Sequence, residues 1–214
     1  MYKVILFDLD GTIIDSSLGV TNSVKYALSK FNIEVKENSE LLSYLGPPLI
    51  YSFQTFHGLS YSDAERAVEY YRSTYPVKGI FENRVYPGIE ELLKTLKDMG
   101  FIISLATSKP EKYAKMILEN LDLAKYFDKF CGATLDGKIN EKIDVMKYTL
   151  ESLGVQDYKT VLMIGDRKYD INASNELGID SVGVLYGFGN REELEASNAK
   201  YIVENALDIL KIVK

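Results

Sequence analysis

The chain has 214 residues, of which 46% are hydrophobic and 26% are charged, and its formal net charge is −6. This size and composition fit a globular core with a smaller accessory unit, and the negative charge argues against nonspecific binding to nucleic acid or acidic membranes. The single cysteine, Cys131, excludes an internal disulfide, and the single histidine, His57, excludes a multi-histidine metal site. We expect a cytoplasmic protein with a buried thiol, and no apolar run approaches the ~20 residues of a membrane span.

The first predicted strand is the apolar run VILF at residues 4–7, which leads directly into two aspartates, Asp8 and Asp10. From about residue 16 to residue 86 no run is typical of a strand, and apolar residues at helical spacing predict helices instead. The prolines of LGPPL, residues 45–49, interrupt this region because consecutive prolines prevent a continuous helix. The sequence therefore predicts a helical insertion after the first strand.

Beyond residue 86, apolar runs of strand length alternate with helical patterns. The predicted strands cover residues 101–106, 129–133, 161–165 and 180–185. Several of these runs are apolar at nearly every residue, which is typical of parallel strands covered on both faces. The pattern predicts an α/β core with a Rossmann-like, doubly wound parallel sheet, formed by residues 1–15 and 87–214. Residues 16–86 are expected to form a separate α-helical cap domain.

Polar side chains follow the predicted strands at the points where these strands end. They are Asp8 and Asp10 after the first strand, Thr107 and Ser108 after the second, Lys138 and Lys142 after the third, and Asp166 and Asp170 after the fourth. Because ligands bind beyond the carboxyl ends of the strands in an open parallel sheet, we expect these groups to meet in one crevice. Each group alone has a simpler explanation as a turn, a helix start or a surface charge. Their joint placement favours a common site.

Clustered carboxylates without histidine or cysteine indicate an all-oxygen site of the kind that suits Mg²⁺. A carboxylate in such a site can attack a phosphorus atom to give an aspartyl phosphate. A second acid can protonate the leaving oxygen and then activate water, while a lysine and hydroxyl groups hold the phosphoryl oxygens. The sequence thus indicates phosphoryl chemistry that depends on Mg²⁺.

The sequence resembles the haloacid dehalogenase superfamily of phosphohydrolases over nearly the whole chain. Its first motif, a strand followed by DxDGT, appears as VILFDLDGT, and its fourth, GDxxxD after a strand, appears as VLMIGDRKYD. The second motif appears as IISLATS, and the third, a lysine on a helix, best fits NEKIDVMKYTL. Within the superfamily, PGIEELL, TSKP and GVLYGFG resemble the phosphoglycolate phosphatase-like branch, and the helical insertion resembles a type 1 cap.

This resemblance implies roles for the residues that match its motifs. Asp8 would be the nucleophile and Asp10 the general acid and base. The Mg²⁺ ligands would be Asp8, the main-chain carbonyl of Asp10, and Asp166, with Asp170 near the metal waters. The phosphoryl group would be bound by Thr107, Ser108 and Lys142, with Lys138 as the alternative to Lys142.

The expected activity is Mg²⁺-dependent hydrolysis of a small, phosphoglycolate-like phosphomonoester by a monomer or homodimer. Gly46 and Pro47 in a stiff loop, and Arg72 on a cap helix, are the candidates for contact with the leaving group, although packing and surface roles are the favoured explanation of cap residues. The alternatives are a 5'-nucleotidase, a sugar-phosphate phosphatase or phosphomutase, and a noncatalytic protein that binds a phosphorylated metabolite. No nucleic acid or membrane partner is expected.

Overall fold

The computed structural model describes residues 1–213, and its contacts divide the chain into two compact units. One unit contains Met1–Asp15 and Val85–Lys214, and the other contains Ser16–Arg84. The chain returns to the first unit at Val85, and the backbone N–H of the next residue, Tyr86, donates to the Ile13 carbonyl at 3.0 Å. None of the helices within residues 1–213 is long and apolar enough to cross a membrane.

The first unit is an α/β fold built on a six-stranded sheet with the order β5-β4-β1-β6-β7-β8. Neighbouring strands in this sheet pair in parallel. The strands are β1 (Val4–Phe7), β4 (Ile102–Pro110), β5 (Lys129–Ala133), β6 (Val161–Gly165), β7 (Asp180–Val184) and β8 (Tyr201–Val203). The doubly wound parallel sheet predicted from the sequence is therefore confirmed. Strand β8 was not predicted, and β4 continues past the predicted end at residue 106.

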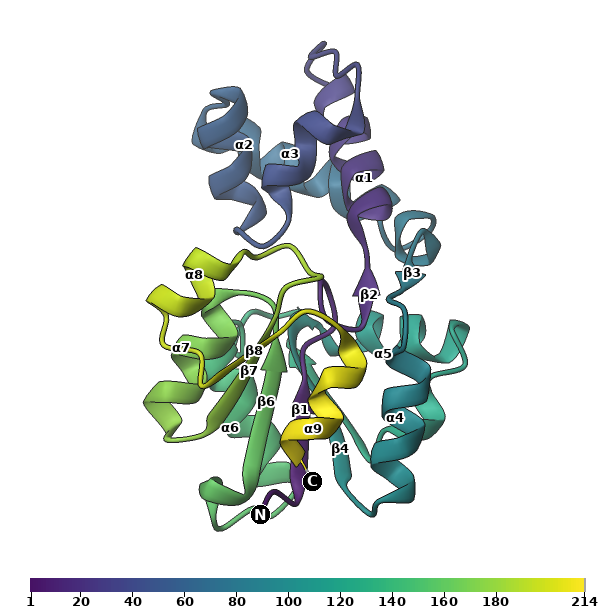
Figure 1. The fold of residues 1–214 in the computed structure, drawn as a ribbon. Coiled ribbons are helices and arrows are strands. Elements are labelled where there is room, and N and C mark those ends of the chain that lie inside the picture. The colour runs from purple at the N-terminus through teal and green to yellow at the C-terminus, as the bar shows by residue number, and fades with distance from the viewer. Residues whose placement is uncertain (214) are drawn as a thin grey trace. The chain divides into compact units, whose positions relative to one another are not determined.

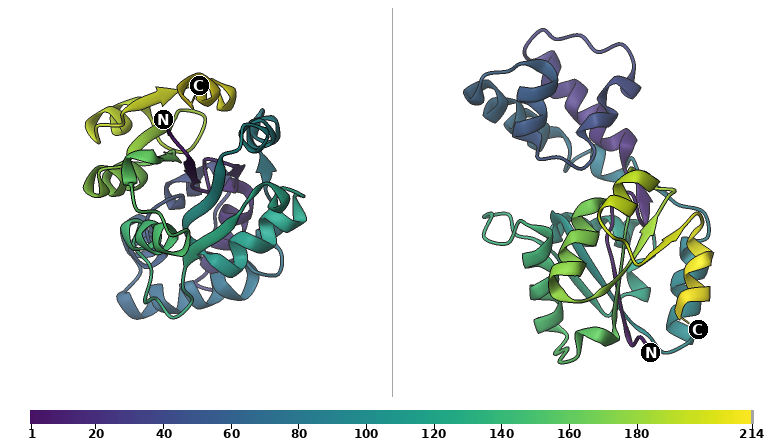
Figure 2. Two further views of the ribbon diagram at one scale, coloured as in Figure 1. Left: turned by 90° about the horizontal axis from the view of Figure 1, so that it is seen from below. Right: turned by 60° about the vertical axis from the view of Figure 1, so that its left-hand side comes forward.

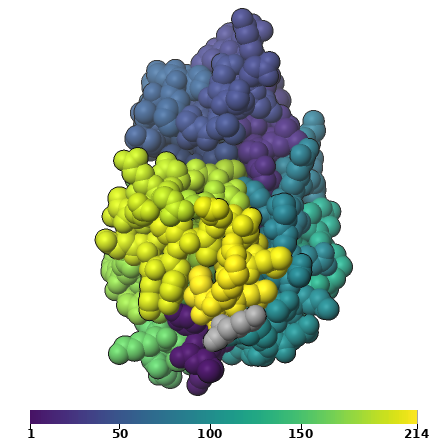
Figure 3. Space-filling view, in the orientation of Figure 1, coloured from purple at the N-terminus to yellow at the C-terminus, as the bar shows by residue number. Residues whose placement is uncertain are grey.

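Helices cover both faces of this sheet, with α6 and α7 on one face and α4 and α5 on the other (Figures 1 and 2). The helices of the unit are α4 (Ile89–Asp98), α5 (Glu111–Asn120), α6 (Lys142–Ser152), α7 (Lys168–Leu177), α8 (Arg191–Ala196) and α9 (Leu210–Val213). Short 3₁₀ helices are η3 (Ala124–Tyr126), η4 (Tyr158–Thr160) and η5 (Ala206–Ile209). In Figure 3 the segment from β8 to α9, drawn in yellow, forms part of the visible surface of this unit.

Alternate residues of the central strands supply the two cores of the α/β unit, because successive side chains of a strand point to opposite faces. Val4 and Leu6 of β1 pack with Met146 and Leu150 of α6. Strand β1 is buried at all four positions, which explains why its sequence is a continuous apolar run. Cys131 of β5 is also buried, so the predicted packing role of this thiol is confirmed.

The second unit is a helical cluster with its own apolar core. It contains α1 (Ser17–Ser29), α2 (Leu49–His57), α3 (Tyr61–Thr74), η1 (Asn38–Tyr44) and η2 (Gly79–Phe81). Leu28, Leu41, Phe53 and Ala67 are fully buried in its core. Helix α2 begins directly after Pro48. This start is expected, because a proline disfavours helical backbone in the residue before it but is itself compatible with the beginning of a helix. A two-stranded sheet, β2 (Ile14–Asp15) and β3 (Arg84–Val85), lies where the chain passes from one unit to the other.

Candidate active site

Asp8 lies at the carboxyl end of β1, the strand that pairs with β4 on one side and β6 on the other. Its backbone N–H donates to the Ile164 carbonyl at 2.9 Å, which continues the β1–β6 pairing into the site. The Asp8 side chain is only 13% exposed. Burial raises the pKa of Asp8 to about 6, although the nearby Lys142 ammonium acts in the opposite direction.

Asp166 and Asp170 reach the same place from the end of β6 and the first turn of α7. Asp166 is fully buried, and its Oδ2 accepts a hydrogen bond from the Phe188 backbone N–H at 2.7 Å. Asp170 accepts a hydrogen bond from the Arg167 backbone N–H at 3.1 Å, so it also gives a partner to the amide that precedes α7. One oxygen from each of Asp8, Asp166 and Asp170 lies within 4.8 Å of the others.

Lys142 is the buried cation of this carboxylate cluster. Its Nζ lies 2.8 Å from an oxygen of Asp8 and 2.8 Å from an oxygen of Asp170, and it donates to the Ala106 carbonyl at 3.0 Å. Burial tends to lower the pKa of Lys142, but the charges of Asp170 and Asp8 outweigh it and leave the pKa above its ordinary value. Burial likewise raises the pKa of Asp166 well above its ordinary range. Lys142 begins helix α6, so the fold places it by fixing where that helix starts.

Lys138, the alternative to Lys142, does not reach this cluster. Its side chain is 83% exposed, and its Nζ pairs with Asp136 at 2.9 Å. The structure therefore brings Lys142, and not Lys138, to the carboxylates that follow β1 and β6.

Asp10 and Thr107 lie beside the cluster at the ends of β1 and β4. Thr107 is buried, and its hydroxyl accepts from the backbone N–H of Lys109 at 3.2 Å, while Ser108 is exposed. Asp10 is held by Lys109, the lysine of the TSKP motif, to which the sequence assigned no role. The Nζ of Lys109 lies 2.8 Å and 2.7 Å from the two carboxylate oxygens of Asp10.

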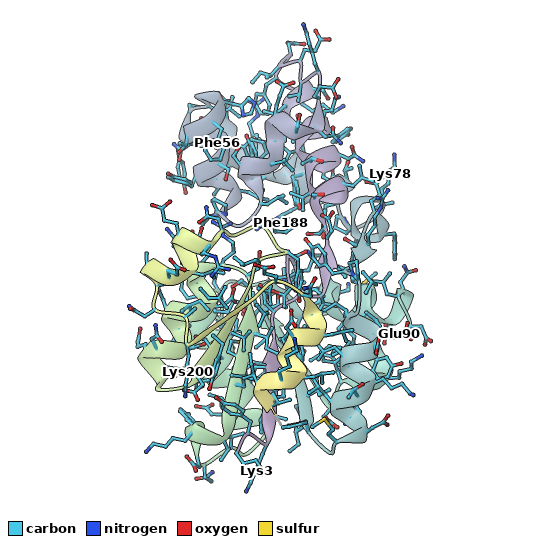
Figure 4. The ribbon with its side chains drawn as sticks, in the orientation of Figure 1. Lys3, Phe56, Lys78, Glu90, Phe188 and Lys200 are labelled. Atoms are coloured by element: carbon cyan, nitrogen blue, oxygen red, sulfur yellow. The ribbon has the colours of Figure 1, made fainter. Side chains whose placement is uncertain are left out.

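The loop after β7, residues 185–190, is a second element of the site; the sequence linked its GVLYGFG motif to a family branch but assigned it no place in the site. Besides the Phe188 contact to Asp166, the Tyr186 hydroxyl donates to the Thr12 carbonyl at 3.1 Å. Figure 4 labels Phe188 in this loop, at the end of the sheet opposite to Lys3. The sequence signal was GFG, two glycines separated by one residue, which is typical of a backbone that must approach another closely.

The three residues expected to contact the leaving group all lie in the helical unit. Gly46 and Pro47 occupy the turn between η1 and α2, and Arg72 is exposed on α3. Next to that turn, Tyr44 is 2% exposed, and its hydroxyl lies 2.8 Å from Nδ1 of His57. The roles of Gly46, Pro47 and Arg72 in binding stay predictions.

The parallel sheet, with clustered carboxylates and a buried lysine at its strand ends, is the core of a hydrolase with a Rossmann-like fold. The chain belongs to the haloacid dehalogenase-like hydrolase family, whose sequence model matches residues 5–184. This match includes both aspartate motifs and Lys142.

Relatives with assigned names differ in the activity that each name states. A 5'-nucleotidase of Pseudomonas aeruginosa is 38% identical over 91% of this chain and 88% of its own length. The tyrosine-protein kinase PtkA of Mycobacterium tuberculosis is 32% identical over 95% of this chain and 69% of its own. A phosphoglycolate phosphatase of Vibrio parahaemolyticus is 28% identical over 99% of this chain and 96% of its own length. The crystal structure of a predicted phosphatase from Clostridium acetobutylicum is 46% identical, covers 100% of this chain and 98% of its own, and superimposes with a TM-score of 0.92.

Proposed function

We propose that this protein is a Mg²⁺-dependent phosphatase that hydrolyses a small phosphomonoester through an aspartyl phosphate on Asp8. The observation that supports this proposal best is the buried cluster of Asp8, Asp166 and Asp170 with Lys142 at the carboxyl end of the sheet. A nucleophile, a set of oxygen ligands and a fixed cation then occupy one small region, as transfer of a charged phosphoryl group requires.

The residues of the cluster fit a magnesium ion. Their donors are carboxylate oxygens only, they lie within 4.8 Å of one another, and neither the single histidine nor the single cysteine is among them. Mg²⁺ takes oxygen ligands and retains waters, so two or three carboxylates suffice. When bound, Mg²⁺ would neutralise the charge of the phosphoryl group. The proposed ligands are Asp8, Asp166 and the Asp10 carbonyl, and Asp170 lies near enough to join them.

The chain's own residues supply both halves of the reaction. The Asp8 carboxylate forms a bond to phosphorus as the bond from phosphorus to the leaving oxygen breaks, and Asp10 gives that oxygen a proton. Water then attacks the aspartyl phosphate, Asp10 takes a proton from it, and Asp8 and inorganic phosphate are released. Lys142, which contacts Asp8 at 2.8 Å, holds the nucleophile and is placed to bind the phosphoryl oxygens.

Two substrate classes have support among the relatives. A phosphoglycolate-like ester agrees with the branch motifs and with the name of the Vibrio relative. A nucleoside 5'-monophosphate is the second candidate, because the relative named 5'-nucleotidase is 38% identical over nearly the whole chain. Both substrates have an alkoxide leaving group, so both need the proton that we assign to Asp10.

The decisive experiment measures inorganic phosphate released from a panel of phosphate esters, with Mg²⁺ and with EDTA. We expect turnover with Mg²⁺, loss in EDTA, and highest kcat/KM for phosphoglycolate or a nucleoside 5'-monophosphate. Asp8→Asn should show no turnover, and Asp98→Asn, a change at an exposed carboxylate at the end of α4, should behave as wild type. Full activity in EDTA or in Asp8→Asn would contradict the mechanism, and phosphoryl transfer to a tyrosine peptide without hydrolysis would contradict the activity.

A further inference from the structure

Lys109 lies at the end of β4 and crosses to Asp10 at the end of the neighbouring strand β1. Strands β1 and β4 pair in parallel from Val4 with Ile102 to Phe7 with Leu105, so the residues after both strands emerge side by side (Figure 1). The Nζ of Lys109 contacts both oxygens of Asp10, at 2.8 Å and 2.7 Å. The Lys109 side chain is 8% exposed and that of Asp10 is 28% exposed, so this ion pair is not an ordinary surface contact.

The backbone of Lys109 is fixed on both sides by its neighbours. Its N–H donates to the Thr107 hydroxyl at 3.2 Å. Its carbonyl packs against Gly132 of β5, where an added Cβ would lie 2.6 Å from the Lys109 oxygen and 2.7 Å from the Glu111 nitrogen. Pro110 follows and precedes the first residue of α5. Because β5 and α5 hold this segment, the Lys109 ammonium is a hydrogen-bond donor with a fixed position rather than a mobile surface charge.

We propose that Lys109 is a positioning residue for Asp10, an inference that rests on the phosphatase function proposed above. With one ammonium on both oxygens, the plane of the Asp10 carboxyl group is set. When Asp10 carries a proton, one oxygen keeps its contact with the ammonium, which leaves the protonated oxygen to donate to the leaving oxygen. The proton passes from Asp10 to the leaving oxygen in the first half of the reaction and returns to Asp10 from water in the second.

This role differs from that of Lys142. Lys142 pairs with Asp8 and Asp170, and so acts on the nucleophile and the oxygen cluster. A lysine that binds the phosphoryl group matters equally for every phosphomonoester. A lysine that orients the general acid matters most where the leaving group needs a proton, because a good leaving group such as p-nitrophenolate departs without one.

The test compares kcat/KM for p-nitrophenyl phosphate and for an alkyl phosphate that the wild type hydrolyses. Lys109→Met should lower the rate on the alkyl ester about 10-fold or more beyond its effect on p-nitrophenyl phosphate, within the ~10²–10⁴-fold that proton transfer supplies. The loss should fall mainly on kcat, and the inhibition constant of inorganic phosphate should stay unchanged. Lys109→Arg should recover part of the rate, and Lys112→Met, at an exposed lysine of α5, should match wild type.

A double-mutant cycle with Asp10→Asn completes the test. Once Asp10 cannot exchange a proton, Lys109→Met should lower the alkyl phosphate rate by less than about 2-fold further, because the two residues act as a unit. Equal losses on both esters, or full additivity with Asp10→Asn, would overturn the positioning role while leaving the phosphatase function intact. A wild type that releases phosphate from no ester in Mg²⁺ would overturn both.

Discussion

At the scale of single residues, close backbone approach holds the carboxylate of Asp166 in place. An added Cβ at Gly187 would lie 2.2 Å from the Gly11 carbonyl oxygen and 2.4 Å from the Asp166 Cβ. Such separations are far inside van der Waals contact, so only glycine fits this position. The adjacent Phe188 N–H can then reach the buried Asp166 oxygen at 2.7 Å. The loop thus orients a proposed magnesium ligand through its backbone rather than through a side chain.

We predict that Gly187→Ala weakens Mg²⁺ binding at least 10-fold, because the loop must move and Asp166 loses its aligned hydrogen-bond donor. Mutation of groups that hydrogen-bond to a metal ligand typically lowers metal affinity 10–100-fold. Mg²⁺ affinity is measured by isothermal titration calorimetry, with the melting temperature as a check on folding. Gly100→Ala is the matched control. Its φ of +86° makes alanine unfavourable, but no atom lies within 4 Å of an added Cβ, so its stability should fall with unchanged Mg²⁺ affinity. Wild-type affinity in Gly187→Ala would refute the role of the loop.

At the scale of elements, helix α8 supports the start of helix α7. Glu193 of α8 accepts from the Arg167 side chain at 2.9 Å and from the Lys168 backbone N–H at 2.8 Å. The Lys168 N–H is one of the first amides of α7, which have no partner within their own helix. Burial would raise the pKa of Glu193, but the Arg167 and Lys168 contacts outweigh it and lower the pKa. Asp170 lies in this same first turn, so α8 helps to hold the site.

Glu193→Ala should therefore destabilise the protein by about 1.5–3 kcal/mol, the usual contribution of hydrogen bonds to a charged group. Glu192→Ala, at the exposed neighbouring position on α8, should stay within about 0.5 kcal/mol of wild type. Urea denaturation followed by circular dichroism gives both free energies of unfolding. Similar values for the two variants would show that α8 does not stabilise α7 through Glu193.

The sequence predicted the strands of the sheet that are buried over most of their length. Strands β1 and β6 are buried at every position, so their apolar runs were clear. Strand β8 has three residues at the sheet edge and is only partly buried, and three residues carry no measurable periodicity. In the site, motifs with fixed spacing identified Asp8 and Asp166, whereas the choice between Lys142 and Lys138 needed the structure. The Lys109–Asp10 pair joins positions 99 residues apart, so it depends on strand order rather than on any local pattern.

At the scale of the whole molecule, the site concentrates charge in a protein that is already acidic. Asp8, Asp10 and Asp170 pair with Lys109 and Lys142, and Asp166 lies in the same cluster, so these four carboxylates and two lysines have a formal charge of −2 when fully ionised. That excess matches the charge of one divalent cation. Without a cation, ionisation of the buried acids opposes folding, because a buried carboxylate has lost its hydration. Stability should therefore depend on pH and on Mg²⁺ together.

The sign of this dependence follows from the pKa of Asp8, which is about 6 in the folded chain against an ordinary 3.8. Between these values the folded state binds more protons than the unfolded state, so the free energy of unfolding falls as pH rises through this window. Asp166, whose pKa is also raised, acts in the same direction. In EDTA, we expect ionisation of Asp8 to lower the free energy of unfolding by on the order of 3 kcal/mol between pH 4 and pH 7, at about 1.4 kcal/mol for each unit of pKa shift. Carboxyls with lowered pKa values, such as Asp180 and Glu193, have the opposite sign: their contribution to stability is lost as pH falls below their ordinary values of 3.8 and 4.5.

Urea denaturation at a series of pH values, in EDTA and in Mg²⁺, measures this effect. Asp8→Asn cannot ionise at that position, so its stability in EDTA should decline less steeply with pH than that of the wild type. Mg²⁺ favours the ionised carboxylates, so it should raise the melting temperature more at pH 8 than at pH 5. If the wild type and Asp8→Asn lose the same stability between pH 4 and pH 7, the raised pKa does not belong to Asp8. Equal stabilisation by Mg²⁺ at both pH values would place the bound ion away from this cluster.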